Sequence, residues 1–239
     1  MFIKKIQNNK IALLILFLGF IGSCLLSINN INKYDKNIKN PQNNVFYHQM
    51  IKADAYRYLS QGSEIKDQIK KGVNFFETGP ENYTKYLPSR LAALYYYFFD
   101  INLFNNSSEK KINTGIHLNY LLIQCFFYFF CLTLLYFSLI KIINKKICFF
   151  ILLFLCFEPT IFQYHASFWS ESIFFSLQIV LISIILKKKK SIFNFFIIGF
   201  FLGILSLQKE YSLFYIILIA IYFIFTSTLN YKKIFLSNQ

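Results

Sequence analysis

Acidic residues and arginine are scarce in this chain. Its 239 residues include 25 Lys and Arg but only 11 Asp and Glu, and just two of the cations are arginines, Arg57 and Arg90. The sequence contains no G-x-G-x-x-G, no Walker loop, no C-x-x-C and no H-E-x-x-H. The three histidines are isolated, with no second nitrogen ligand at metal spacing. The common nucleotide-binding and zinc-enzyme motifs are therefore excluded.

The connection between the first two apolar stretches, residues 29–114, lacks cysteine altogether. A disulfide framework would be expected in such an external segment, so its absence argues against one. All the cysteines lie within or at the ends of apolar segments, where we predict small buried hydrophobes: Cys24, Cys125, Cys131, Cys148 and Cys156.

Long apolar runs dominate what is present. The chain is 56% hydrophobic and 21% aromatic, with a mean hydropathy of +0.44, which is too apolar for a soluble domain of this length. Six stretches have roughly the 17–25 residues that a membrane-spanning helix needs: Ile11–Ile28, Gly115–Ile140, Ile147–Tyr164, Ser167–Leu186, Ser191–Leu207 and Tyr211–Leu229. We predict an all-α integral membrane protein, one module over residues 1–239, with about six transmembrane helices. The first stretch also resembles a cleavable signal segment, but an uncleaved anchor is our preferred interpretation.

Charge is distributed unevenly between the connections of these stretches. Alternate connections carry lysines and no acid: Lys4, Lys5, Lys10, Lys141, Lys145, Lys146, Lys187–Lys190, Lys232 and Lys233. By the positive-inside rule they are cytoplasmic, so both termini face the cytoplasm and every Asp and Glu faces outward. We expect a bacterial inner (plasma) membrane as the location. The net charge of +14 needs only anionic membrane lipids as a partner, and we do not expect nucleic-acid binding.

The large external loop, residues 29–114, is predicted to contain helices that lie along the membrane. Apolar periodicity predicts one helix from Phe46 to Lys71, ended by Gly72. A second is predicted from Ser89 to Phe104, with Pro88 near its first turn. We expect Tyr95, Tyr96 and Tyr97 of that helix to lie at the level of the lipid head groups.

Candidate catalytic and substrate-binding residues cluster in the first of these helices. Helical spacing places Arg57 and Tyr58 on the face of Asp54, at i+3 and i+4. An ordinary surface ion pair also explains this spacing. However, arginine offers a planar fork suited to phosphate, and both arginines of the chain flank the presumed site within the loop. Glu171 and Glu158 stand at the margins of apolar segments, where a carboxylate is costly unless it faces protein, water or a partner.

Four segments stand out in this context: Asp54–Tyr58, Tyr86–Leu94, Ser167–Phe174 and Gly199–Lys209. Together they resemble segments of the GT-C superfamily of polytopic glycosyltransferases, which use polyprenyl-phosphate sugars, as the mannosyl- and aminoarabinosyltransferases do. Asp54-Ala-Tyr-Arg-Tyr58 is similar to an early D-x-x-x-Y pattern after the first span. Tyr86–Leu94 resembles a Pro-containing entry into a juxtamembrane helix, and Ser167–Phe174 resembles a Ser/Thr-Glu motif that opens a span. Gly199–Lys209 is similar to a G-x-x-x-G-x-x-x-x-x-R/K stretch, whose glycines also have the spacing of a close helix contact.

The resemblance implies transfer of a sugar from a polyprenyl-phosphate carrier to an external glycan, lipid or protein acceptor. Asp54 would be the catalytic general base. The other implied residues bind substrate, either through the phosphate of the carrier or through sugar hydroxyls: Arg57, Tyr58, Arg90, Glu171 and Lys209. No cofactor is implied, and a divalent metal is not supported because Ala55, not a second acid, follows Asp54.

Two other interpretations remain open. The chain has six predicted spans where such transferases usually have more, so it would also fit an inactive, truncated transferase. A non-enzymatic transporter, flippase or assembly subunit would explain the spans equally well. Transporters, however, usually place polar or broken helices near the membrane midplane, whereas here the polar residues cluster at the external face.

Overall fold

The computed structural model describes residues 9–39, 53–78, 86–102, 114–168, 170–186, 192–208 and 214–221. All regular secondary structure in these ranges is helical, as the sequence predicts. The helices are α2 (Lys10–Lys39), α4 (Ala53–Lys70), α5 (Tyr86–Phe98), α6 (Thr114–Leu139), α7 (Lys145–Phe157), α8 (Pro159–His165), α9 (Ser170–Ile185) and α10 (Ile192–Gln208). Residues 214–221 are also helical.

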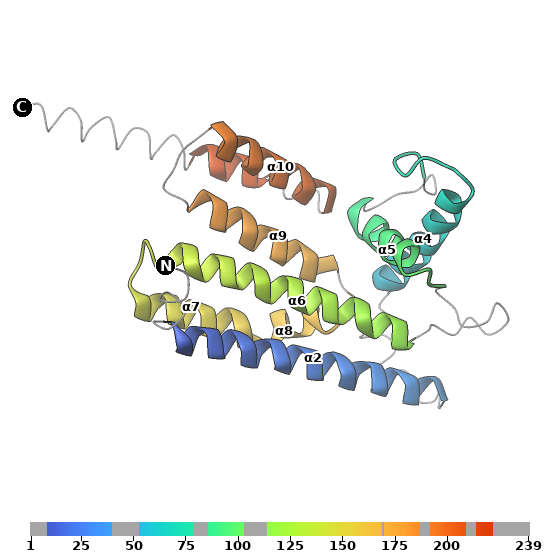
Figure 1. The fold of residues 1–239 in the computed structure, drawn as a ribbon, viewed down its shortest axis with the longest axis horizontal. Helices are drawn as coiled ribbons and strands as arrows, with labels where there is room; N and C mark the ends of the chain where they lie inside the picture. The colour runs from blue at the N-terminus through green and yellow to red at the C-terminus, as the bar shows by residue number, and fades with distance from the viewer. Residues whose placement is uncertain are drawn as a thin grey trace, which may run out of the picture.

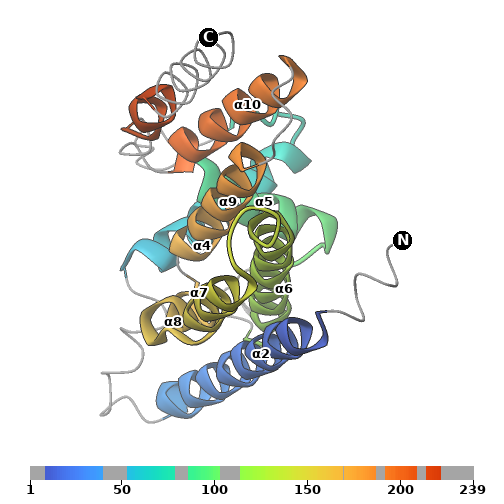
Figure 2. The same ribbon diagram turned by 90° about the vertical axis from the view of Figure 1, so that its left-hand side faces the viewer.

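The helices form a bundle with a helical pair at one end. Helix α6 lies between α2 and α9, and α10 packs on the far side of α9 (Figures 1 and 2). Helices α7 and α8 lie against α2 and α6. The α4–α5 pair sits where α2 ends and α6 begins, at the right of Figure 1. The first residues of α2, the end of α6 and the start of α7 meet at the opposite end.

Among the described residues, two helices are long and apolar enough to cross a membrane. Within α2 the candidate span is Lys10–Lys33, with a mean hydropathy of 2.7, and within α6 it is His117–Leu139, with 1.9. These match the first two predicted spans. Large apolar side chains are exposed on the outer faces of the bundle, where they suit contact with lipid: Phe17, Phe126, Phe150, Phe154, Phe196 and Phe200.

The third predicted span, Ile147–Tyr164, is a bent pair of helices instead of a continuous one. Only together are helices α7 and α8 long and apolar enough to cross a membrane. They meet at an angle of 56°. The break occurs because Glu158 leaves helical geometry and its side chain accepts a hydrogen bond from the backbone N–H of Ile161 at 2.7 Å. Pro159, which has no N–H to donate, then opens α8.

The remaining predicted spans are only partly described. Helices α9 and α10 are apolar but contain 16 and 17 residues. At 1.5 Å per residue each extends about 24–26 Å, short of the roughly 30 Å hydrocarbon core. Most of the sixth predicted span, Tyr211–Leu229, lies outside the described residues. The described helices thus supply two spans, or three if the bent pair is one span, and the total of six stays a prediction.

Close helix contacts occur at other glycines than those the sequence suggested. A Cβ on Gly62 would lie 2.7 Å from the Cβ of Ala92, so glycine allows α4 and α5 to touch. A Cβ on Gly19 would lie 2.7 Å from the ring of Phe129, where α2 meets α6. A Cβ on Gly199 or on Gly203 would have no described neighbouring atom within 4 Å. Their G-x-x-x-G spacing therefore makes no helix contact in the described part of the chain.

The helical pair follows the prediction in outline. Helix α4 ends near Gly72, which has a φ of 87° that glycine adopts without strain. The part of the first predicted helix before residue 53 lies outside the described residues. Helix α5 ends at Phe98, earlier than predicted.

Tyr97 is exposed, but Tyr95 and Tyr96 are buried, and the Tyr96 hydroxyl lies 2.9 Å from Nε2 of His117. Both side chains contact residues of α6, so they are buried in protein, and their level relative to the lipid head groups stays a prediction.

The cysteines agree with the prediction. All five carry free thiols, and four of them are buried in helix packing. The exception, Cys24, is half-buried.

Candidate functional site

A small cavity lies at the junction between the α4–α5 pair and the bundle. Its volume is about 10 Å³, close to the minimum for one water molecule. Its lining comes from α4, α5, α6, the turn before α9 and α9 itself: Tyr58, Leu59, Pro88, Ala92, Tyr120, Gln124, Phe168, Ser170 and Ile173. The junction thus brings together residues from three of the four segments that carry the family resemblance.

Apolar packing holds this junction closed. Ile31 of α2, Leu59 of α4 and Leu121 of α6 belong to one buried cluster, which also contains residues of α5 and the turn before α9. The aromatic ring of Phe168 stacks on Tyr120, with ring centroids 6.2 Å apart. The Ser89 hydroxyl donates a hydrogen bond of 2.8 Å to Oε1 of Gln61, and both residues are buried, which ties α5 to α4.

One amide side chain supports the irregular backbone between α8 and α9. Nε2 of Gln124, on α6, lies 3.0 to 3.3 Å from the carbonyl oxygens of Tyr164, His165 and Ser167. Non-helical backbone inside an apolar bundle must find such partners, because lipid and packed side chains offer none.

Amides from two further helices complete this support. Nδ2 of Asn30, on α2, donates to the carbonyl oxygen of Ala166 at 3.1 Å. Nε2 of Gln208, at the end of α10, donates to the carbonyl oxygen of Ser170 at 2.8 Å. The turn before α9 is therefore held by side chains from α2, α6 and α10. None of these three amides was predicted from the sequence, although Gln124 and Gln208 stand out as polar residues within apolar runs.

His165 is a second buried polar group at this turn. Its Nδ1 lies 2.6 Å from the hydroxyl of Ser172, and its ring stacks on Tyr128 with centroids 3.6 Å apart. Its carbonyl oxygen also accepts a hydrogen bond from the thiol of Cys125 at 3.3 Å. His165 and Ser172 thus link the end of α8 to the first turn of α9.

The predicted residues of the first loop helix are placed in two ways. Tyr58 is buried and lines the cavity, while Arg57 is exposed on the same helix. The backbone of Asp54 belongs to α4, which agrees with the helical spacing i, i+3, i+4. The side chain of Asp54 lies outside the described part of the structure.

Glu171 and Lys209 each adjoin a residue of the junction. Glu171 is half-buried in the first turn of α9, and its Oε2 accepts a hydrogen bond from the Ser170 hydroxyl at 3.3 Å. Lys209 follows Gln208 in the sequence but lies outside the described residues.

Arg90 is directed into the protein. Its side chain is buried, and Nη2 donates to the carbonyl oxygens of Thr78 at 2.8 Å and Phe76 at 3.4 Å. The guanidinium also lies over the ring of Phe75, 5.6 Å from its centroid. Arg90 is absent from the lining of the small cavity. In this structure it fixes the segment that follows α4 onto α5.

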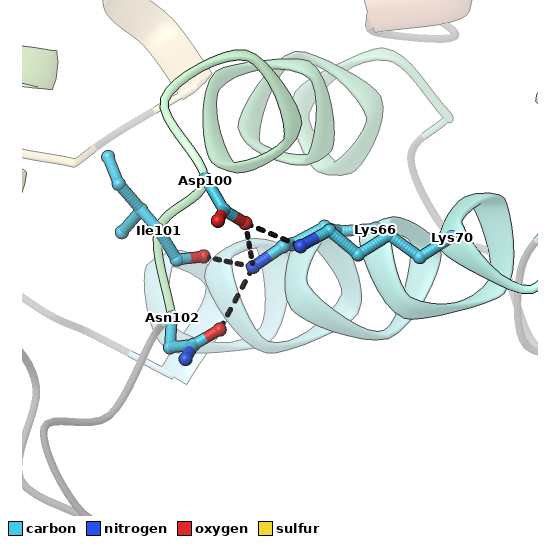
Figure 3. Close-up of polar contacts among 5 residues, drawn as sticks. All are labelled: Lys66, Lys70, Asp100, Ile101 and Asn102. Atoms are coloured by element: carbon cyan, nitrogen blue, oxygen red, sulfur yellow. Dashed lines mark hydrogen bonds and ion pairs between the residues drawn. The ribbon is translucent and has the colours of Figure 1, made fainter.

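A lysine pair clamps the end of α5 onto α4 (Figure 3). Nζ of Lys66 donates to the carbonyl oxygen of Ile101 at 2.6 Å and to Oδ1 of Asn102 at 2.9 Å. The carboxylate of Asp100 lies 3.9 Å from the same ammonium and bonds directly to Lys70. Burial lowers the pKa of Lys66, and the hydrogen bond from Lys70 lowers the pKa of Asp100. This clamp was not foreseen from the sequence.

No group of three His, Cys, Asp or Glu side chains that could hold a metal ion occurs among the described residues. Comparison of the chain with protein-family models, curated proteins and solved structures gave no match.

Proposed function

We propose that this chain transfers a sugar from a polyprenyl-phosphate carrier to an acceptor at the end of the bundle that carries α4 and α5. One observation supports the proposal most. Tyr58, Pro88 and Ser170 line one cavity, and Gln208 donates a hydrogen bond to the carbonyl of Ser170. Each belongs to a different one of the four segments that resemble GT-C enzymes, so these distant segments converge in space.

In the proposed reaction, Asp54 accepts the proton of an acceptor hydroxyl or amine as that group attacks the anomeric carbon. The bond between the anomeric carbon and the phosphate oxygen breaks, and polyprenyl phosphate leaves with the electron pair. Arg57 and Lys209 hold the phosphate, whose charge needs cations near the membrane boundary. Glu171 and Tyr58 orient sugar hydroxyls, and Arg90 positions the segment after α4.

The size of the cavity restricts where the donor binds. A space of about 10 Å³ holds one water molecule, far less than a sugar ring. The donor therefore binds on the exposed side of α4, where Arg57 lies, or after α4–α5 moves away from α9. The external face is the predicted side of this site.

A second candidate, a non-catalytic membrane subunit, is favoured by the same closed junction. Arg90 and Lys66 are both buried against backbone carbonyl groups, where they stabilise the fold. A transferase without activity would share these features. Binding and transfer have to be measured separately to distinguish these functions.

The single tryptophan of the chain, Trp169, offers a direct binding signal. Its sequence neighbours Phe168 and Ser170 line the cavity, so its fluorescence is chosen to report a ligand that reaches the junction. The purified full chain in micelles is titrated with a short polyprenyl phosphate and, separately, with the matching polyprenol. The proposal expects saturable binding of the phosphate that is weakened in Arg57→Gln. Equal responses to both lipids would favour the non-catalytic subunit.

Transfer is tested with Asp54→Asn in proteoliposomes. A panel of polyprenyl-phosphate sugars is supplied with a lipid and glycan extract, and released polyprenyl phosphate is measured by mass spectrometry. Loss of a general base should lower the rate about 10²–10⁴-fold while binding is retained. Glu64→Gln, which removes an exposed acid from the same helix, is the matched control and should keep the full rate. Equal rates for Asp54→Asn and wild type would refute the assignment of the base and make Glu171 the next candidate.

A further inference from the structure

A second cavity lies at the opposite end of the bundle from the junction. It has a volume of about 670 Å³ and is formed by the start of α2, the end of α6 and the start of α7. Ligand sites typically enclose about 300–1,000 Å³. This cavity shares no lining residue with the α4–α5 junction, so it is independent of the proposed transferase site.

Three lysines and apolar walls define its chemistry. Lys10, Lys145 and Lys146 line the cavity, and all three are exposed. Ile11 and Phe150, which also line it, are exposed apolar side chains on the outer surface of the helices. The cavity is thus cationic where the helices begin and apolar where they enter the bundle.

No carboxylate opposes these lysines nearby in the sequence. The first acidic residue of the chain is Asp35, and none occurs between Lys110 and Phe157. At the inner wall, the Tyr136 hydroxyl donates a hydrogen bond of 2.8 Å to Oδ1 of Asn9, which joins α6 to the residue before α2. This bond fixes the shape of the cavity without adding charge.

The start of α7 adds to the positive potential. Lys145 and Lys146 form its first turn, where the helix dipole is positive. The side chain of Asn144 caps the helix by accepting a hydrogen bond from the backbone N–H of Lys146 at 2.9 Å. The lysine side chains therefore extend from a helix start that is rigidly capped.

We propose that this cavity binds one anionic phospholipid of the adjoining leaflet. Its phosphate contacts Lys10, Lys145 and Lys146, and an acyl chain lies along Phe149 and Phe150. A phosphate needs cations without competing acids, and an acyl chain needs an apolar wall that continues onto the lipid-facing surface. The lining contains three lysines and no carboxylate, and its apolar residues include side chains exposed on the outer surface, as in basic pockets between transmembrane helices.

The test is native mass spectrometry of the full chain in detergent, titrated with phosphatidylglycerol or phosphatidylcholine. Wild type should retain phosphatidylglycerol selectively. The variant Lys10→Gln/Lys145→Gln/Lys146→Gln should bind it on the order of 100-fold more weakly, from about fivefold per lysine. Because all three side chains are exposed, the variant should keep its fold, which circular dichroism checks. Glycerol phosphate, which has the head-group charge without acyl chains, should not displace the lipid.

The matched control is Lys187→Gln/Lys188→Gln/Lys189→Gln, which removes the same charge from another lysine-rich segment. It should bind phosphatidylglycerol as wild type does. Equal losses in both triple variants would show a general charge effect and overturn the proposal. Equal retention of phosphatidylcholine, or displacement by glycerol phosphate, would overturn it as well. Failure of the lipid-binding proposal leaves the transferase proposal intact, because the transferase proposal is tested separately by Trp169 fluorescence and by the Asp54→Asn variant.

Discussion

Replacement of Lys66 by Met should loosen α5 from α4 without affecting the rest of the bundle. Lys66 is only 1% exposed, yet it carries an ammonium that bonds to the carbonyl oxygen of Ile101 and to Asn102. Methionine fills similar space but donates no hydrogen bond. The variant therefore leaves the carbonyl of Ile101 without its donor at the point where the chain leaves α5.

The magnitude follows from the bonds that are lost. A hydrogen bond to a charged group contributes about 1.5–3 kcal/mol net. Burial opposes this gain, since it lowers the pKa of Lys66 and so disfavours its charged form. We therefore expect Lys66→Met to reduce the free energy of local opening by about 1.5–3 kcal/mol. That range corresponds to amide exchange that is roughly 10- to 100-fold faster, where exchange is governed by the equilibrium of local opening.

Hydrogen exchange with mass spectrometry measures this effect directly. Peptides covering 86–102 should exchange faster in Lys66→Met, while peptides from α6 should not change. Lys71→Met is the control, because Lys71 is exposed and follows the same helix, and its effect should stay within about 0.5 kcal/mol. If both variants exchange alike, Lys66 does not hold α5 in place and the reasoning from its contacts fails.

Three further predictions concern other parts of the chain. The hydrogen bond from Lys70 lowers the pKa of folded Asp100 below its usual 3.8, so its stabilisation is complete above pH 3.8 and is lost as the pH falls below it. Exchange of α5 relative to α6 should therefore rise in acid in wild type but not in Asp100→Asn. Gln124→Leu removes the donor to three backbone carbonyls and should cost about 2–4 kcal/mol. Its thermal midpoint should fall by roughly 10 °C, and an unchanged midpoint would show that the amide is dispensable. Finally, in a cysteine-free background, an external thiol reagent should modify a cysteine at position 63 and not one at 191, and the reverse would overturn the predicted topology.

The sequence alone determined the elements that depend on local composition. The first two predicted apolar stretches became α2 and α6, because an apolar stretch in an apolar environment can satisfy its backbone hydrogen bonds within itself only as a helix. The periodicity after residue 46 predicted α4, and Gly72 predicted its end. The absence of a disulfide also followed from where the cysteines stand.

The break at Glu158 was available in the sequence but was not predicted. A capping acid followed by proline is a recognised start of a helix, yet hydropathy over a longer window favoured one continuous span. The window averages residues on both sides of the break, so it does not register a cap formed by one side chain and one N–H.

Tertiary structure decided which polar side chains support the fold and which remain available for chemistry. Arg90 and Lys66 both belong to the predicted external loop, but the side chain of each is buried against backbone carbonyls. Asn30 meets a carbonyl 136 residues away, and Gln208 meets one 38 residues away. Such partners depend on which helix faces come together. Propensity and hydropathy describe a residue and its near neighbours, whereas a buried hydrogen bond depends on the position of a backbone group brought there by another part of the chain.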